Sequence, residues 1–111
     1  MKLSEVTRLL VAAQECDTLE SYIDECGGSL PDDSYYEDDD ASKAVEVLTV
    51  LYECRDGISI NTLLRLYSGS ANDFYREYGI PRRTLQNWLT ESSNHTDPPQ
   101  YLMRLILADL I

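Results

Sequence analysis

The chain lacks the features that mark most enzymes and metalloproteins. Its 111 residues include one histidine, His95, and three cysteines, none of which forms a Cys-x-x-Cys pair. A zinc site would therefore lack ligands. No glycine-rich phosphate loop and no Ser/His/Asp or Cys/His set is present. We expect a protein that is not an enzyme and that binds no cofactor and no metal, with His95 in a solvated loop.

Long apolar runs are also missing. No stretch of 18 or more apolar residues occurs, so no membrane-spanning helix is expected. Glu5 and Arg8 interrupt the apolar pattern of the first residues, which argues against a signal peptide. The cysteines Cys16, Cys26 and Cys54 are then expected to be reduced thiols. These absences indicate a small cytoplasmic protein.

Positive charge is scarce and unevenly placed. Residues 1–60 contain 4 Lys and Arg against 15 Asp and Glu, a net charge of −11, whereas residues 61–111 contain 5 of each kind and are neutral. We expect two parts, an acidic N-terminal helical segment (1–57) with a charged loop (27–40), and a second domain (58–111). The neutral half is the part in which a nucleic-acid-binding surface could lie, because such surfaces need cations near phosphates.

Apolar residues recur mostly at helical spacing, which predicts an all-α fold, a small bundle of about six helices. The expected helices are 4–16, 18–26, 41–55, 60–67, 70–78, 81–90 and a last one that opens at residues 97–99. The first two could form one bent helix. The β-branched residues of 41–55 leave a strand as an alternative there, although the length of the segment favours a helix.

Polar residues mark where several of these helices begin. Ser59 is placed to cap the helix that follows it. Asp17 with Glu20, and Asp97 with Gln100, have the spacing of capping boxes. Pro98 would occupy the first position of the last helix, where its missing N–H is harmless.

The charged loop 27–40 has two interpretations. In the first it is a solvated linker that also places acids at the start of the next helix, where the helix dipole favours them. In the second it is a protein-binding surface, whose carboxylates imitate phosphates and whose tyrosines anchor in a partner's pocket. The residues of this surface would be Asp32, Asp33, Tyr35, Tyr36, Glu37, Asp38, Asp39 and Asp40.

The stretch 70–88 predicts two short helices joined by a sharp turn. Ser70 and Asp73 form a third capping box, and Gly79 suits the left-handed residue that ends a helix. Leu85 and Trp88, three residues apart, give the second helix a buried face. The opposite face carries side chains that can grip phosphates or pair with base edges, namely Arg82, Arg83, Gln86 and Asn87.

This pattern is similar to the helix-turn-helix of the phage-repressor-like (Xre/Cro) family, over about residues 58–110. Gly79, Ile80, Leu85 and Trp88 stand where that family has its turn glycine, an aliphatic residue and two inward-pointing side chains. Pro81 departs from the family's usual Ser or Thr cap. The family also often has a DNA-contacting glutamine where this chain has Ala71.

The resemblance implies a DNA-binding transcription regulator, or an antitoxin-like protein, that reads the major groove of double-stranded DNA with helix 81–90. Arg82, Arg83 and Asn87 would contact bases with help from Gln86, and Ser70 and Asn72 would hold a phosphate. Such a protein is expected to be a homodimer. In the last helix Leu107 and Ile111 exceed what a small core needs, which suggests a dimer surface.

A second hypothesis rests on the net charge of −11 and on the acidic surface of the charged loop, which would make the contact. A small acidic protein can occupy the channel of a basic nucleic-acid-binding protein, as phage-encoded DNA mimics and anti-CRISPR proteins do. A bacterial or phage origin fits both hypotheses. Binding to DNA and binding to such a protein are the two outcomes that experiments must separate.

Overall fold

The computed structural model describes residues 1–38, 40–90 and 97–111, and in these ranges the protein is all-α, with no strand. Contacts divide the chain into two units, unit 1 (Met1–Gly57 with Ile111) and unit 2 (Ile58–Leu110). The predicted fold class is confirmed. Within the described ranges, no helix has both the length and the apolar character that a membrane span requires.

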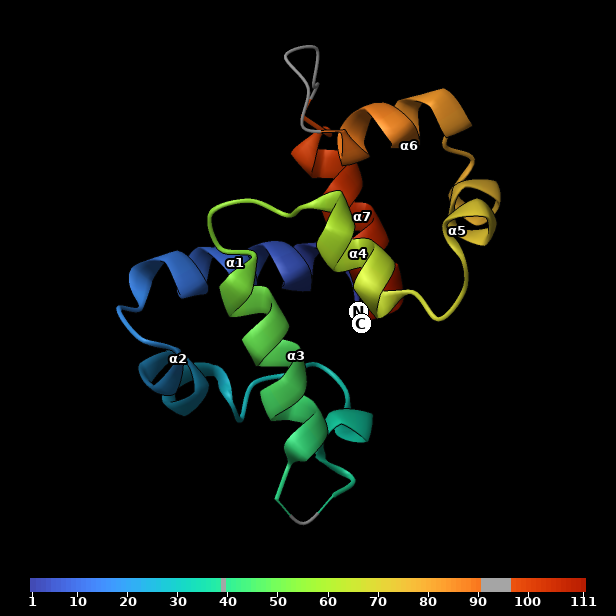
Figure 1. The fold of residues 1–111 in the computed structure, drawn as a ribbon. Helices are drawn as coiled ribbons and strands as arrows, with labels where there is room; N and C mark the ends of the chain where they lie inside the picture. The colour runs from blue at the N-terminus through green and yellow to red at the C-terminus, as the bar shows by residue number, and fades with distance from the viewer. Residues whose placement is uncertain (39, 91–96) are drawn as a thin grey trace. The chain divides into compact units, whose positions relative to one another are not determined.

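Unit 1 is built around its third helix. Its elements are α1 (Leu3–Glu15), α2 (Leu19–Cys26), the 3-10 helix η1 (Asp33–Tyr36) and α3 (Ser42–Glu53). Helix α3 contacts the other three, as Figure 1 lets the reader follow, and its Leu48 and Leu51 are fully buried. The strand alternative for this segment is wrong: Ser42–Glu53 is an α-helix, and its buried residues Ala44, Leu48 and Leu51 recur at the spacing of three or four residues that a helix brings to one face.

Helices α1 and α2 are separate elements rather than one bent helix. Cys16, which follows α1, has extended backbone angles (φ −101°, ψ 132°). Thr18 is the N-cap of α2, and its side chain accepts a hydrogen bond from the Ser21 backbone at 3.1 Å. The capping box expected of Asp17 and Glu20 is therefore wrong by one residue, because the threonine hydroxyl fills the capping position itself.

Two acids before α3 accept hydrogen bonds from its first residue, Ser42. Ala41 is in the left-handed region (φ 54°) and carries no capping side chain. Asp40 instead accepts from the Ser42 backbone at 3.2 Å, and Asp38 accepts from the Ser42 hydroxyl at 2.7 Å. The expectation that the charged loop places acids at a helix start is confirmed for these two residues.

Unit 2 has four helices in its described part. They are α4 (Ile60–Leu66), α5 (Ala71–Tyr78), α6 (Arg82–Leu89) and α7 (Gln100–Leu110). Helix α4 contacts α7 and α6, and α5 contacts α6. Leu63, Phe74 and Met103, from three of these helices, are fully buried. Ser59 caps α4 as predicted, accepting from the Thr62 backbone at 3.2 Å.

The last helix begins later than predicted. A residue that precedes proline is pushed out of the helical region, so Pro98, which precedes Pro99, cannot open the helix. Helix α7 starts at Gln100. The Gln100 side chain does not complete a box with Asp97; its Oε1 accepts from the Ile58 backbone N–H at 2.7 Å and its Nε2 donates to the Ile58 carbonyl at 3.1 Å.

The buried face of α7 also differs from the expected one. Leu107 is fully buried, so the suggestion that it is surplus to the core is wrong. Ile111 is half-buried. The apolar side chains that α7 exposes are Tyr101 (60%) and Leu105 (39%), one turn apart.

Candidate functional site

Helix α5 is held at both ends by local hydrogen bonds. The Ser70 hydroxyl accepts from the Asp73 backbone at 3.2 Å, and Asp73 Oδ2 accepts from the Ser70 backbone at 3.4 Å. At the other end Gly79 has left-handed angles (φ 66°, ψ 26°), and the next residue, Ile80, donates its N–H to the Tyr75 carbonyl at 2.9 Å. The capping box and the glycine turn are both as predicted.

Pro81 is the N-cap of α6 rather than its first helical residue. Its ψ of 135° is extended, so the helix runs from Arg82 to Leu89 instead of over 81–90. The Pro81 carbonyl accepts the first helical hydrogen bond, from the Leu85 N–H at 3.1 Å. Proline has no side-chain acceptor, and no acidic residue lies in the first turn. The positive end of the α6 dipole therefore faces outward without a capping group.

The two faces of α6 have opposite character. Leu85 (3% exposed) and Trp88 (7% exposed) are buried, as the i, i+3 spacing predicts. The four candidate DNA-binding residues on this helix are exposed; they are Arg82, Arg83, Gln86 and Asn87. Helix α6 thus presents a polar, cationic surface on a base fixed by packing.

The arginines of α6 are not neutralised by any carboxylate of the described part of unit 2. Within the described part of unit 2, neither Arg82 nor Arg83 forms an ion pair with a carboxylate. An arrangement with both guanidinium groups against acids and Trp88 in solvent would have excluded a binding role for this surface. The guanidinium groups can instead donate to an external anion or to base edges.

The residues expected to hold a phosphate lie at the start of α5. Ser70 and Asn72 are exposed, as expected, but the Ser70 hydroxyl oxygen already accepts from Asp73 within the capping box. What Ser70 still offers an anion is its hydroxyl proton. Asn72 can add its amide group.

An aromatic cluster, missed by sequence reasoning, holds α5 within unit 2. The ring of Phe74 lies 5.4 Å from that of Tyr67 and 5.0 Å from that of Tyr78. The Tyr78 hydroxyl donates to Asp109 of α7 at 2.6 Å, and the Tyr67 hydroxyl donates to Glu77. Because α5 also contacts α6, the cluster fixes the helix against which the arginine-bearing helix rests.

Both carboxylate contacts perturb tyrosine ionisation. The hydrogen bond to Glu77 raises the pKa of Tyr67 to about 12. Burial, followed by the hydrogen bond to Asp109, raises the pKa of Tyr78. In each case a neutral phenol is favoured, because the carboxylate accepts from it and would repel a phenolate. Neither tyrosine is suited to be a base near neutral pH.

The tyrosines of the charged loop attach it to the rest of unit 1. Tyr35 is 4% exposed. The Tyr36 hydroxyl accepts from the Leu30 backbone at 2.9 Å and donates to the Gly27 carbonyl at 2.8 Å. Both side chains thus serve the packing of unit 1, and neither is displayed in the way that an anchor for a partner would need.

The carboxylates of the same loop are exposed. They are Asp32, Asp33, Glu37, Asp38 and Asp40; Asp39, the remaining member of the expected protein-binding set, lies outside the described residues. A hydrogen bond from the Ser34 backbone lowers the pKa of Asp32, with Ser34 N lying 2.8 Å from its Oδ1. His95 also lies outside the described residues.

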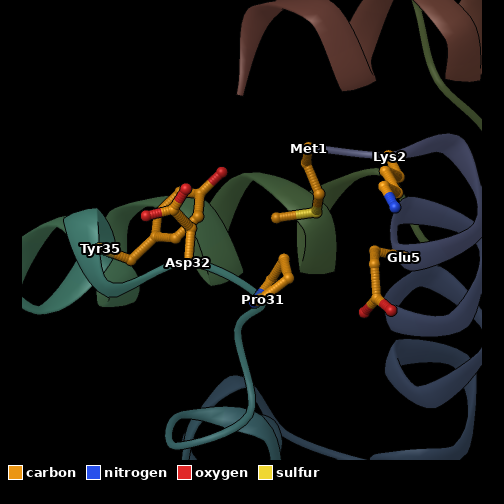
Figure 2. Close-up of a pocket in the computed structure, with 6 residues that line it drawn as sticks. All are labelled: Met1, Lys2, Glu5, Pro31, Asp32 and Tyr35. Atoms are coloured by element: carbon orange, nitrogen blue, oxygen red, sulfur yellow. The ribbon is translucent and has the colours of Figure 1, made fainter.

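A small pocket of about 320 Å³ opens beside this loop. Figure 2 shows Lys2 and Glu5 on the α1 side, with Asp32 and Tyr35 opposite. The lining residues are Met1, Lys2, Glu5, Pro31, Asp32 and Tyr35. They include no histidine, cysteine or serine.

The described residues contain no group of three His, Cys, Asp or Glu side chains placed to hold a metal ion. Cys16, Cys26 and Cys54 are free thiols, as expected. The Cys16 thiol donates to Glu25 at 3.1 Å, and that hydrogen bond raises its pKa. Burial raises the pKa of Cys26. Both shifts disfavour the thiolate, which is the reactive form.

No protein-family model, no curated protein and no solved structure matches the chain. The residues and the geometry of the two units are therefore the basis on which a function can be inferred. In unit 2 these are the turn at Gly79, the buried pair Leu85 and Trp88, and the exposed arginines of α6.

Proposed function

We propose that the chain is a DNA-binding regulator of the repressor-like kind, which places α6 in the major groove of double-stranded DNA. The observation that carries the proposal is the division of α6 into two faces. Leu85 and Trp88 are buried, while Arg82 and Arg83 are exposed and, within the described part of unit 2, have no carboxylate partner.

The roles within the proposed interface follow from side-chain chemistry. Arg82 and Arg83 lie in the first turn of α6, which is the end that such a helix points at base edges. A guanidinium group there can pair bidentately with guanine, and Asn87 can pair with adenine. Ser70 and Asn72 at the start of α5 would hold a phosphate beside the groove, which fixes the register without reading sequence.

Two properties support regulation rather than catalysis. The pocket beside the charged loop is lined by no histidine, cysteine or serine, and the perturbed tyrosines and cysteines have raised pKa values that keep them protonated. A single helix of eight residues also offers little contact area. A homodimer that engages two half-sites one helical turn apart would supply the rest.

Binding of a labelled random-sequence duplex, titrated with salt, tests the proposal. The wild type is expected to bind at low salt and to weaken steeply as salt rises, because neutralised phosphates release counterions. The double change Arg82→Ala with Arg83→Ala should weaken binding by at least tenfold. The slope of log affinity against log salt concentration should also become shallower, by roughly one for each phosphate that the variant no longer neutralises.

The matched control removes two positive charges elsewhere. Lys2→Ala with Lys43→Ala makes the same change in net charge in unit 1, at two exposed positions. If the control weakens binding as much as the arginine pair does, net charge and not the α6 surface governs the affinity. Failure of the wild type to bind any duplex at low salt would remove the basis of the proposal.

A second candidate function has one observation in its favour. The exposed carboxylates of the charged loop lie on a segment that Tyr35 and Tyr36 attach to unit 1. A row of carboxylates on an attached segment is what an inhibitor of a basic nucleic-acid-binding protein would use in place of phosphates.

Competition distinguishes this candidate from the first. The chain is added to a complex of labelled duplex with a basic protein that binds DNA without sequence preference, and release of DNA is measured. Asp33→Asn with Glu37→Gln should reduce the release, since both side chains are exposed and neither caps α3. Unchanged release would mean that these carboxylates are only solvated.

A further inference from the structure

We infer that unit 1 acts as an electrostatic filter on the α6 surface, meaning that its acids repel nucleic acid over a long range and weaken attachment through α6 at low salt. The inference rests on the proposed function, because it concerns the same surface. It concerns what the formal charge of −11 does to binding through α6.

The charge is concentrated in one unit. All of the net charge of −11 belongs to residues 1–60, and residues 61–111 are neutral. Three of the four lysines and arginines of unit 1 also make contacts within it. Arg8 pairs with Glu5 at 2.8 Å, the Lys43 ammonium lies 5.4 Å from the centre of the Tyr35 ring, and the Arg55 guanidinium lies 4.1 Å from that of Tyr52.

Unit 1 must stay near any ligand of α6, whatever the arrangement of the units. The chain passes from unit 1 to unit 2 through the short connection of residues 54–59, between the end of α3 at Glu53 and the start of α4 at Ile60. A unit of this length has a radius of gyration of only about 10 Å. The acids of unit 1 are therefore within a few tens of ångströms of a duplex held by α6, that is, on the order of 30 Å.

Salt decides whether repulsion acts over that distance. The screening length is about 30 Å at 0.01 M salt and about 8 Å at 0.15 M. At low salt, the acids of unit 1 oppose the approach of a polyanion even when they touch nothing. At physiological salt that repulsion is screened, while direct contacts between arginine and the duplex remain. Rising salt therefore has two opposed effects on the wild type, and its salt dependence is shallower than its phosphate contacts alone would give.

Four carboxylates can be neutralised without removing a cap or a hydrogen bond that the structure places. The variant carries Asp24→Asn, Asp33→Asn, Glu37→Gln and Glu46→Gln, all at exposed positions, and it lowers the charge of residues 1–60 from −11 to −7. The control variant carries Asp24→Glu, Asp33→Glu, Glu37→Asp and Glu46→Asp. It changes the same four side chains and keeps the charge.

Binding of all three chains to a labelled random-sequence duplex is measured from 0.01 M to 0.15 M salt. The neutralised variant should bind roughly fivefold or more tightly than the wild type at 0.01 M and nearly equally at 0.15 M, because screening removes the difference. Its plot of log affinity against log salt should be steeper. The control variant should follow the wild type at every salt concentration.

Arg82→Ala with Arg83→Ala in the neutralised background separates the two proposals. If the neutralised chain binds through these arginines but shows the affinity and salt slope of the wild type, the filter is refuted and the proposed function stands. If neither chain binds DNA, or if the neutralised chain binds equally well without the arginines, the proposed function fails and the filter fails with it. Tighter binding by the control variant would also refute the filter, since its charge is unchanged.

Discussion

Replacing Gly79 with alanine tests the turn on which the direction of α6 depends. Gly79 has left-handed backbone angles (φ 66°, ψ 26°), and a Cβ built at this position meets no heavy atom within 4 Å. The substitution therefore adds backbone strain and no steric clash. The expected effect on unfolding can be worked out from the backbone alone.

A left-handed conformation costs an L-residue roughly 1–2 kcal/mol. Alanine also restricts the unfolded chain, which offsets about 0.4–1 kcal/mol of that cost. The free energy of unfolding should fall by about 1 kcal/mol, which corresponds to a drop in Tm of roughly 4–8 °C for a small unit. Gly79→Asn should lose less, because asparagine tolerates the left-handed region.

Fluorescence in a urea titration provides the assay. Trp88 is the chain's one tryptophan and is 7% exposed in unit 2, so its emission reports the unfolding of the unit that contains the turn. Far-UV circular dichroism then follows the helices of both units. A shift of the urea midpoint without a change of slope would show a loss of stability and not of compactness.

Gly28→Ala is the matched control for this experiment. A Cβ at Gly28 also meets nothing within 4 Å, but its φ is not positive. The control should therefore leave the stability of the chain unchanged or raise it slightly. If Gly79→Ala unfolds at the same urea concentration as the wild type, the turn does not require a left-handed residue and the reasoning about α6 is refuted.

Three further predictions concern unit 2. Leu85→Ala should lower the free energy of unfolding by about 2–5 kcal/mol in the Trp88 assay, and Leu89→Ala, at a position that is 37% exposed, by much less. Gln100→Ala should cost about 1–2 kcal/mol, because it leaves the Ile58 N–H without its acceptor; an unchanged midpoint would contradict this. The raised pKa of Tyr67 means that the folded state holds its proton more tightly, so stability present below pH 10 is lost as the pH rises towards 12. Tyr67→Phe should make that alkaline loss smaller in urea titrations, and an identical loss would refute the assignment.

Sequence reasoning succeeded in unit 2 where the signal lies within one or two helical turns. The box at Ser70 and Asp73 spans three residues, and the buried pair Leu85 and Trp88 spans three. The turn at Gly79 is predicted from one residue, because glycine has no Cβ and adopts left-handed backbone angles at little cost. Each of these features is set by the geometry of a short segment, so the spacing of residue types is enough to predict it.

The interactions that position these helices could not be predicted in the same way. The Gln100 side chain holds the Ile58 backbone across 42 residues, and Tyr78 donates to Asp109 across 31. A glutamine near a helix start has the same spacing whether it completes a capping box with the N-cap residue of its own helix or binds a distant backbone segment. The choice depends on tertiary packing, which local patterns do not contain.

Tyrosines in an acidic segment were similarly ambiguous. Among carboxylates, Tyr35 and Tyr36 suggest a surface that anchors a partner, because the neighbouring residues cannot be buried. The structure buries Tyr35 and gives the Tyr36 hydroxyl two backbone partners. A loop of like charges needs such attachments, since its own residues repel one another and provide little else to hold it.

The net charge of the whole chain is a poor guide to what α6 can bind. A protein of charge −11, taken as one body, would be expected to avoid polyanions. What a phosphate meets at contact distance is the local field, and the first turn of α6 has two arginines, no acid and an uncapped positive helix end. Acids that touch no phosphate act only over the screening length, which shrinks as salt rises. Two opposed charges in one chain are therefore compatible with DNA binding when the cations lie at the contact and the acids lie beyond it.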